Sequence, residues 1–124
     1  MDIGISTACF YPLFTEETIK IISDLECSLC EVFLEAESEY NKDFLNVIKN
    51  EMQKYKLRTN SVHAFCATFE AMLFSEYSRR RTDAKKIFKK VLQAASCLGA
   101  KGYTFHGDRR CDDLARLDFK NYAK

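Results

Sequence analysis

Hydrophobic and polar positions along the chain switch repeatedly between two periods. An alternation of period two, which is typical of a half-buried strand, occurs four times. We expect strands at residues 2–8, 30–36, 57–64 and 102–106. Between them, apolar residues recur every three or four positions, as they do on one face of a helix. We expect helices from about residue 15, from about residue 41 and over residues 78–98, with a fourth opening in residues 112–124.

Signals at the helix ends support these assignments. Thr15 is expected to be the first N-cap, because acidic residues follow it in the first turn. Asn41 is expected to cap the second helix, and Gly99 stands where a C′ glycine belongs after the third. The apolar stripes that should face the core are Ile19, Ile22 and Leu25; then Phe44, Val47, Ile48, Met52 and Tyr55; then Ala84, Ile87, Phe88, Val91, Leu92, Ala95 and Leu98.

The alternation of strands and helices predicts the fold class. Four repeats imply right-handed crossovers and a parallel sheet, which is an α/β fold. Four βα units are half of a (β/α)8 TIM barrel, which takes about 250 residues. We therefore expect residues 1–124 to form one partial barrel domain with strands one to four, ending inside the fourth helix. A small flavodoxin-like sandwich is the alternative, because periodicity does not encode strand order.

The overall charge favours no particular macromolecular partner. With 19 Lys and Arg against 18 Asp and Glu, the chain is nearly neutral. The run Arg79-Arg80-Arg81 is short and has acidic neighbours, so nucleic-acid binding is not expected. No apolar stretch approaches the ~20 residues of a membrane span, and the first residues lack a signal-peptide pattern. We expect a cytoplasmic protein without a membrane partner.

The chain contains 6 cysteines, which we expect to be reduced in that compartment. Cys27 and Cys30 have the CxxC spacing of redox and zinc motifs, but no second CxxC exists. We interpret the pair as small packed residues where a helix gives way to a strand.

The strongest candidates for a site are the two histidines, the only ones in the chain. His63 ends the third expected strand and His106 ends the fourth. Parallel strands deliver their carboxyl ends to one edge of the sheet, so we expect both imidazoles at one rim. A neutral imidazole offers a donor and an acceptor, which suits hydroxyl groups as well as a divalent ion.

The second strand adds carboxylates to this rim. By alternation, Glu31, Phe33 and Glu35 share one face, and Val32 and Leu34 share the other. Glu35 lies nearer the carboxyl end and is the third candidate for substrate binding. We expect Glu31 to pair with a cation or polar group inside the sheet, since an unpaired acid there is costly.

Several segments together resemble a known family. They are Glu31-Val32-Phe33, Ser61-Val62-His63-Ala64, the helix end Ala94-Ala95-Ser96-Cys97-Leu98-Gly99-Ala100, and Thr104-Phe105-His106-Gly107. In order and spacing they look like the amino-terminal half of the xylose isomerase-like TIM-barrel superfamily. That group includes sugar phosphate isomerases and epimerases and the endonuclease IV type of DNA-repair enzyme.

The resemblance implies a barrel with a divalent metal (Mn, Mg, Co or Zn) held by strands five to eight. Those strands are not in this sequence, so we expect no metal ligand, cofactor or catalytic residue here. The family's histidines at the positions of His63 and His106 contact substrate in the isomerases and bind zinc in the nuclease branch.

The expected function is therefore that of an N-terminal half. It would supply sugar-binding groups for metal-assisted aldose–ketose isomerisation or epimerisation, and would be inactive alone. The expected partners are a sugar or sugar phosphate, together with a second copy or a C-terminal half that completes the barrel. The alternatives are a non-catalytic barrel-completing module and half of an endonuclease IV-like enzyme.

Overall fold

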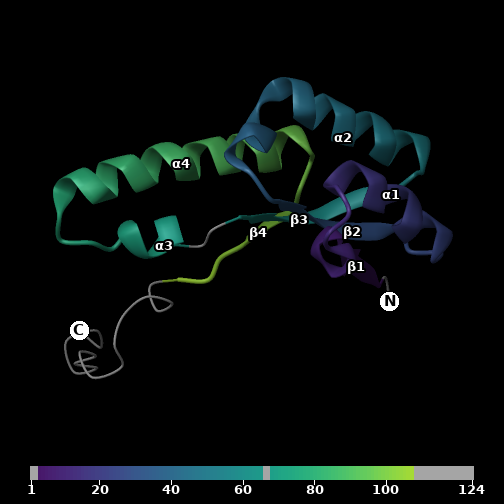
Figure 1. The fold of residues 1–124 in the computed structure, drawn as a ribbon, viewed down its shortest axis with the longest axis horizontal. Coiled ribbons are helices and arrows are strands. Elements are labelled where there is room, and N and C mark those ends of the chain that lie inside the picture. Colours follow the sequence, from purple (N-terminus) through teal and green to yellow (C-terminus); the bar gives the residue numbers. More distant parts are fainter. Residues whose placement is uncertain (1–2, 66–67, 108–124) are drawn as a thin grey trace.

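The computed structural model describes residues 3–65 and 68–107 of the chain (Figure 1). The four expected strands are present and alternate with helices. The elements, in chain order, are β1 (Gly4–Ser6), η1 (Thr7–Phe10), α1 (Thr15–Asp24), β2 (Leu29–Leu34), η2 (Glu37–Tyr40), α2 (Lys42–Lys54), β3 (Arg58–Ala64), α3 (Thr68–Met72), α4 (Ser78–Cys97) and β4 (Gly102–Thr104). The expected fourth helix lies outside the described residues, as do Cys66 and Cys111.

The sheet has the order β1-β2-β3-β4, and every neighbouring pair is parallel. Figure 1 shows α2 and α4 on the same side of this sheet. Sequential order with helices on one side is the arrangement of a (β/α)8 barrel, whereas the flavodoxin-like alternative requires a permuted order. The predicted fold class, half of a TIM barrel, is confirmed.

The core lies between the sheet and its helices. Cys30, Val32 and Leu34 of β2 are fully buried, as is Val62 of β3. They pack in one cluster with buried apolar residues of the three long helices, including Ile19, Ile22, Ile48, Val91 and Ala94. Burial raises the pKa of the Cys30 thiol to about 12, so this cysteine packs as a neutral thiol, beside the sulfur of Met52 at 3.8 Å.

An irregularity between β2 and β3 determines which side chains lie together on the face of the sheet that the helices do not cover. Cys30 lies opposite Thr59, but Glu31 lies opposite Ser61, so Asn60 has no partner across the ladder. Such a bulge inserts one residue and re-aims those that follow. As a result Phe33 is level with His63, and His63 is level with Thr104.

Two of the three expected caps are confirmed. The Asn41 side chain accepts a hydrogen bond from the Phe44 N–H at 2.9 Å, and Gly99 has a φ of +67° after α4. Thr15, in contrast, is wrong as an N-cap, since it is the first residue inside α1. The Phe14 N–H donates instead to the Glu17 carboxylate, at 3.3 Å.

Threonine hydroxyls hold the backbone of Phe33 from two directions. Thr15 is buried, and its hydroxyl donates to the Phe33 carbonyl at 3.1 Å. The hydroxyl of Thr7, which is also buried, accepts the Phe33 N–H at 2.9 Å. These two bonds tie η1 and α1 to β2.

The expected apolar stripes are correct along their centres and wrong at their margins. Leu25, Val47 and Leu92 were expected in the core, but they are 54%, 45% and 46% exposed. Leu25 follows the last residue of α1, so the helical period no longer sets its direction. In α2 the buried residues are Leu45, Ile48 and Met52, which places Val47 beside the stripe rather than on it.

The first and last strands are shorter than the alternation suggested. β1 covers only Gly4–Ser6, because the Ser6 hydroxyl accepts the Ala8 N–H and starts the 3-10 helix η1.

Residues 68–72 form the short helix α3, which was not expected. Of the helices in the described ranges, none is long and apolar enough to cross a bilayer.

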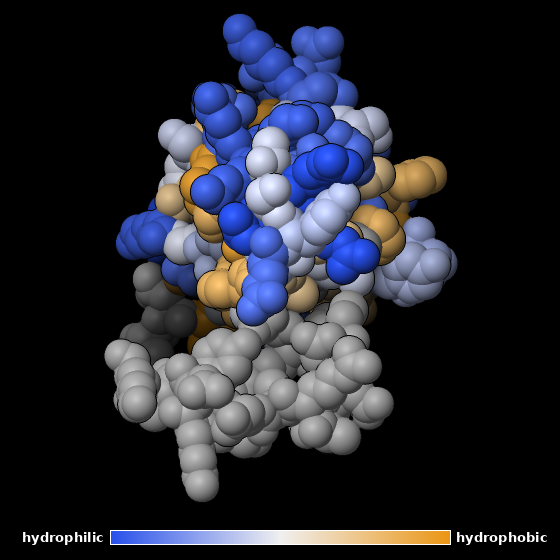
Figure 2. All heavy atoms as spheres, turned by 90° about the vertical axis from the view of Figure 1, so that its left-hand side faces the viewer, coloured by the Kyte–Doolittle hydropathy of each residue, from blue (hydrophilic) through white to orange (hydrophobic). Residues whose placement is uncertain are grey.

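The start of α4 shows what the arginine run does. Figure 2 looks onto this end of the molecule, where hydrophilic side chains dominate the upper surface. Arg81 donates to the backbone carbonyls of Ser75 and Glu76 at 2.6 and 2.8 Å, so it closes the turn before the helix. Arg79 lies over the Tyr77 ring at 5.7 Å. At least two of the three arginines therefore have local structural contacts.

Candidate functional site

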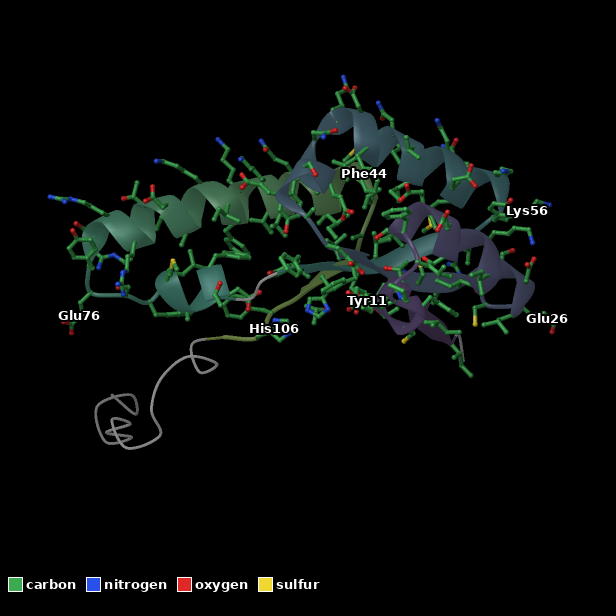
Figure 3. The ribbon with its side chains drawn as sticks, in the orientation of Figure 1. Tyr11, Glu26, Phe44, Lys56, Glu76 and His106 are labelled. Atoms are coloured by element: carbon green, nitrogen blue, oxygen red, sulfur yellow. The ribbon has the colours of Figure 1, made fainter. Side chains whose placement is uncertain are left out.

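The two histidines meet at the carboxyl end of the sheet. His63 is the last residue but one of β3, and His106 lies two residues after the end of β4. Their Nε2 atoms are 3.0 Å apart, and their ring centroids are 4.6 Å apart. Figure 3 shows His106 on the side of the sheet away from α4. The two side chains are 19% and 16% exposed, so the pair is partly open to solvent.

His63 is held between a ring and a carboxylate. Phe33 packs against it edge to face, with ring centroids 4.6 Å apart and planes at 81°. Its Nδ1 lies 3.4 Å from Oε1 of Glu31. Burial lowers the pKa of His63, and although Glu31 opposes that effect, the net shift is downward. At neutral pH this imidazole is therefore uncharged.

Glu31 is the centre of a polar network on the open face of the sheet. Its carboxylate accepts hydrogen bonds from the hydroxyls of Ser61, at 3.1 Å, and Thr104. Burial alone would raise its pKa, but bonds from Thr104, Ser6 and Ser61 outweigh that effect, so the pKa of Glu31 is lowered. The prediction that Glu31 pairs with interior polar groups is confirmed.

Glu70 of α3 plays the corresponding part for His106, and sequence reasoning missed it. Its side chain is completely buried. One carboxylate oxygen accepts a hydrogen bond from the Tyr103 hydroxyl, and the other accepts one from the backbone N–H of His106 at 2.7 Å. Burial raises the pKa of Tyr103, and Glu70 raises it further, so the phenol stays protonated as a donor. The only sequence signal was an acid flanked by apolar residues in an assumed loop, Thr68-Phe69-Glu70-Ala71-Met72.

The four side chains form a row: carboxylate, imidazole, imidazole, carboxylate. A hydrogen bond between two Nε2 atoms needs one hydrogen between them. If Nδ1 of His63 carries the hydrogen that faces Glu31, then His106 donates from Nε2. In that arrangement Nδ1 of His106 carries no hydrogen. It lies 3.4 Å from Glu70 and lacks a hydrogen-bond partner among the described residues.

Glu35, the third expected site residue, lies at a different hollow. Because β2 ends at Leu34, the alternation no longer directs this side chain. Its N–H donates to Glu39 at 2.5 Å. The hollow of about 450 Å³ that it lines is mostly apolar and is formed with Tyr40, Phe65, Phe69, Met72 and Ile87, without either histidine. Its role in binding substrate stays a prediction.

The described residues provide an incomplete ligand set for a metal ion. Both Nε2 atoms could face one ion, with a carboxylate behind each ring as metal-binding histidines usually have. However, within residues 3–65 and 68–107 no three or more His, Cys, Asp or Glu side chains are arranged so that they could hold a metal ion together. Zinc sites take three or four protein ligands. We therefore assign no step to a metal held by these residues.

The pKa shifts predict that the fold weakens in acid. The pKa of His63 is lowered by folding, so its contribution to stability is present above about pH 6.5 and is lost as the pH falls. Glu31 acts in the same direction below about pH 4.3. We expect a lower free energy of unfolding at about pH 5 than at about pH 7.5, measured by urea denaturation.

The variant His63→Gln tests the origin of this slope. It should reduce the difference between the two pH values, while Glu31→Gln should flatten the loss of stability below about pH 4.3. An unchanged slope in His63→Gln would show that other groups cause the effect.

Comparison with known proteins places the fold. Neither protein-family models nor curated protein sequences gave a match. Among solved structures, the chain is similar to a D-psicose 3-epimerase determined in the presence of D-fructose, with a TM-score of 0.76 and 19% identity, over 99% of this chain and 44% of that one. It is also similar to apo YcjR, a 3-keto-D-glucoside 4-epimerase from E. coli, with a TM-score of 0.63 and 17% identity, over 83% of this chain and 36% of that one.

These likenesses concern the fold. The chain spans less than half the length of either epimerase. The expected resemblance in fold to the xylose isomerase-like TIM barrels is confirmed, with this chain corresponding to part of such a barrel.

Proposed function

We propose that this chain supplies the sugar-binding half of a barrel that isomerises or epimerises a sugar or sugar phosphate. One observation carries the proposal: two imidazoles meet at the carboxyl end of adjacent parallel strands, with their Nε2 atoms 3.0 Å apart. This end of a (β/α)8 barrel is where such enzymes bind substrate. The likeness of the fold to two sugar epimerases supports a sugar as the ligand.

The row of side chains suits the recognition of hydroxyl groups. A sugar hydroxyl both donates and accepts, and the imidazole pair offers one Nε2–H and one lone pair. A ligand entering between the rings would replace their mutual hydrogen bond with one bond to each. Glu31 and Glu70 would keep the rings oriented, because they contact the opposite nitrogens and the backbone.

The chemical step would need groups from a complementary half of the barrel. When bound there, a divalent metal would polarise the sugar carbonyl and a neighbouring hydroxyl. A carboxylate of that half would move the proton at the adjacent carbon. His63 and His106 would hold the substrate oxygens in register, and Glu35 would be an accessory polar contact at the rim. We place the assembled protein in the cytoplasm.

Titration with D-fructose and D-psicose, followed by NMR, tests the sugar-binding role. The unmodified chain should show saturable shifts. His63→Ala and His106→Ala should each weaken binding about 10-fold, the equivalent of one lost hydrogen bond of ~1.4 kcal/mol. The control Lys86→Ala changes an exposed residue of α4 and should leave binding unchanged.

Equal binding by the histidine variants and the control would contradict the proposal. A chain that binds neither sugar would also contradict it, and would favour a non-catalytic barrel-completing module.

A further inference from the structure

In the part of the chain that the structure describes, the sheet has two open edges. Within the described residues, β1 pairs only with β2, and β4 pairs only with β3. Each edge strand has three residues, Gly4-Ile5-Ser6 and Gly102-Tyr103-Thr104. Edge strands are usually protected from pairing with another chain by Lys or another charged residue, or by Pro. These two strands contain no charged residue and no Pro. The backbone at both edges is therefore suited to pairing with another strand.

We propose that a second copy of this chain closes the sheet into an eight-stranded barrel. β4 of each copy pairs with β1 of the other, around a two-fold axis that coincides with the barrel axis. Rotation about that axis keeps all strands parallel, and the same contact forms twice, as in an isologous dimer. This inference rests only on the sheet and its edges. It puts a second copy in the place of the separate complementary half described above, and it leaves the sugar-binding role of His63 and His106 unchanged.

The register of the sheet fits this closure. A line of paired residues runs Ser6, Glu31, Ser61, Gly102, from the last residue of β1 to the first of β4. Each strand is thus displaced towards the carboxyl end of the sheet relative to the strand before it, as in the tilted strands of a barrel. A (β/α)8 barrel has a shear of about 8 residues, so each of two identical halves contributes about 4. Ser6 of the second copy then lies about 4 residues beyond Gly102, level with His106.

Side-chain direction agrees with the same register. Ile3 and Ile5 of one copy would lie opposite Tyr103 and Phe105 of the other. Ile5 and Tyr103 pack against the core, and Phe105 lies 6.3 Å from the Phe88 ring of α4, so these side chains are on the helix-covered face. A slip of one residue would place Phe105 beside residues of the opposite face.

The edges also carry exposed apolar side chains that this contact would cover. Ile3 is 65% exposed and Phe105 is 44% exposed, although they belong to opposite edges of the sheet. In the proposed dimer they gather at the same seam. The number of strands agrees as well, because the described sheet has four parallel strands and a (β/α)8 barrel has eight. Two copies therefore provide four strands each for one barrel.

Sedimentation equilibrium of the whole chain tests the proposal. The expected mass is twice the chain mass of 14.4 kDa. Phe105→Lys and Ile3→Lys should each weaken the dimer at least about 10-fold, because burying one unpaired charge costs more than ~1.4 kcal/mol. The control Val47→Lys changes a residue of α2 that is about as exposed as Phe105, and this variant should remain dimeric. Circular dichroism confirms that each variant is folded.

Three results would overturn the proposal: a monomer up to millimolar protein, a dimer that either edge variant leaves intact, or a dimer that Val47→Lys dissociates. The sugar titration is read separately. A monomer that binds sugar removes only the dimer, and a dimer that binds no sugar removes only the proposed function.

Discussion

Replacing Glu70 with alanine should lower the free energy of unfolding by about 3 kcal/mol, the largest effect we expect from a polar residue. The carboxylate is completely buried and accepts hydrogen bonds from the Tyr103 hydroxyl and the His106 N–H. Without it both donors are left unpaired in the interior, which costs each its full desolvation penalty. Urea denaturation followed by circular dichroism measures the loss.

Two further variants separate the hydrogen bonds from the side chain itself. Glu70→Gln keeps the size and one acceptor oxygen, so it should cost less than the alanine variant. Glu76→Ala removes a carboxylate from an exposed residue and should change stability by less than about 0.5 kcal/mol. If Glu70→Ala were as mild as Glu76→Ala, the carboxylate would not be holding these donors in solution.

Leu34→Ala should destabilise the fold by about 2–5 kcal/mol, because it leaves a cavity at the end of β2. Leu34 is fully buried within the core cluster. The control is the same substitution at Leu25, which is 54% exposed and should lose less than about 1 kcal/mol. Both are measured by denaturant midpoints at constant m. Equal losses would mean that Leu25 is buried in solution, as its place in the apolar pattern suggested.

The fold was predictable where a local period is tied to the core. Alternation located β2 and β3, and helical spacing located the buried centres of the three long helices. The bulge at Asn60 and the short helix α3 were not predictable, because both depend on contacts between separate strands and loops. Strand order likewise follows from packing, so the flavodoxin-like alternative could be rejected only from the structure.

The candidate site was likewise predictable in part. The meeting of His63 and His106 followed from parallel topology, since each ends a neighbouring strand. Glu70 was missed because its partners, Tyr103 and His106, are more than 30 positions away in sequence and nothing local marks the pairing. Glu35 was placed by extending an alternation past the end of β2, where the backbone turns and the rule ceases to apply.

The two threonine bonds to the Phe33 backbone have a consequence for recognition. They immobilise the residue whose ring supports one face of the His63 imidazole. The His63 imidazole is therefore already held in place before a ligand binds. Binding then costs little additional side-chain entropy, because that entropy is lost when the chain folds. Removing either hydrogen bond, as Thr7→Val would do, would loosen the Phe33 ring that supports His63.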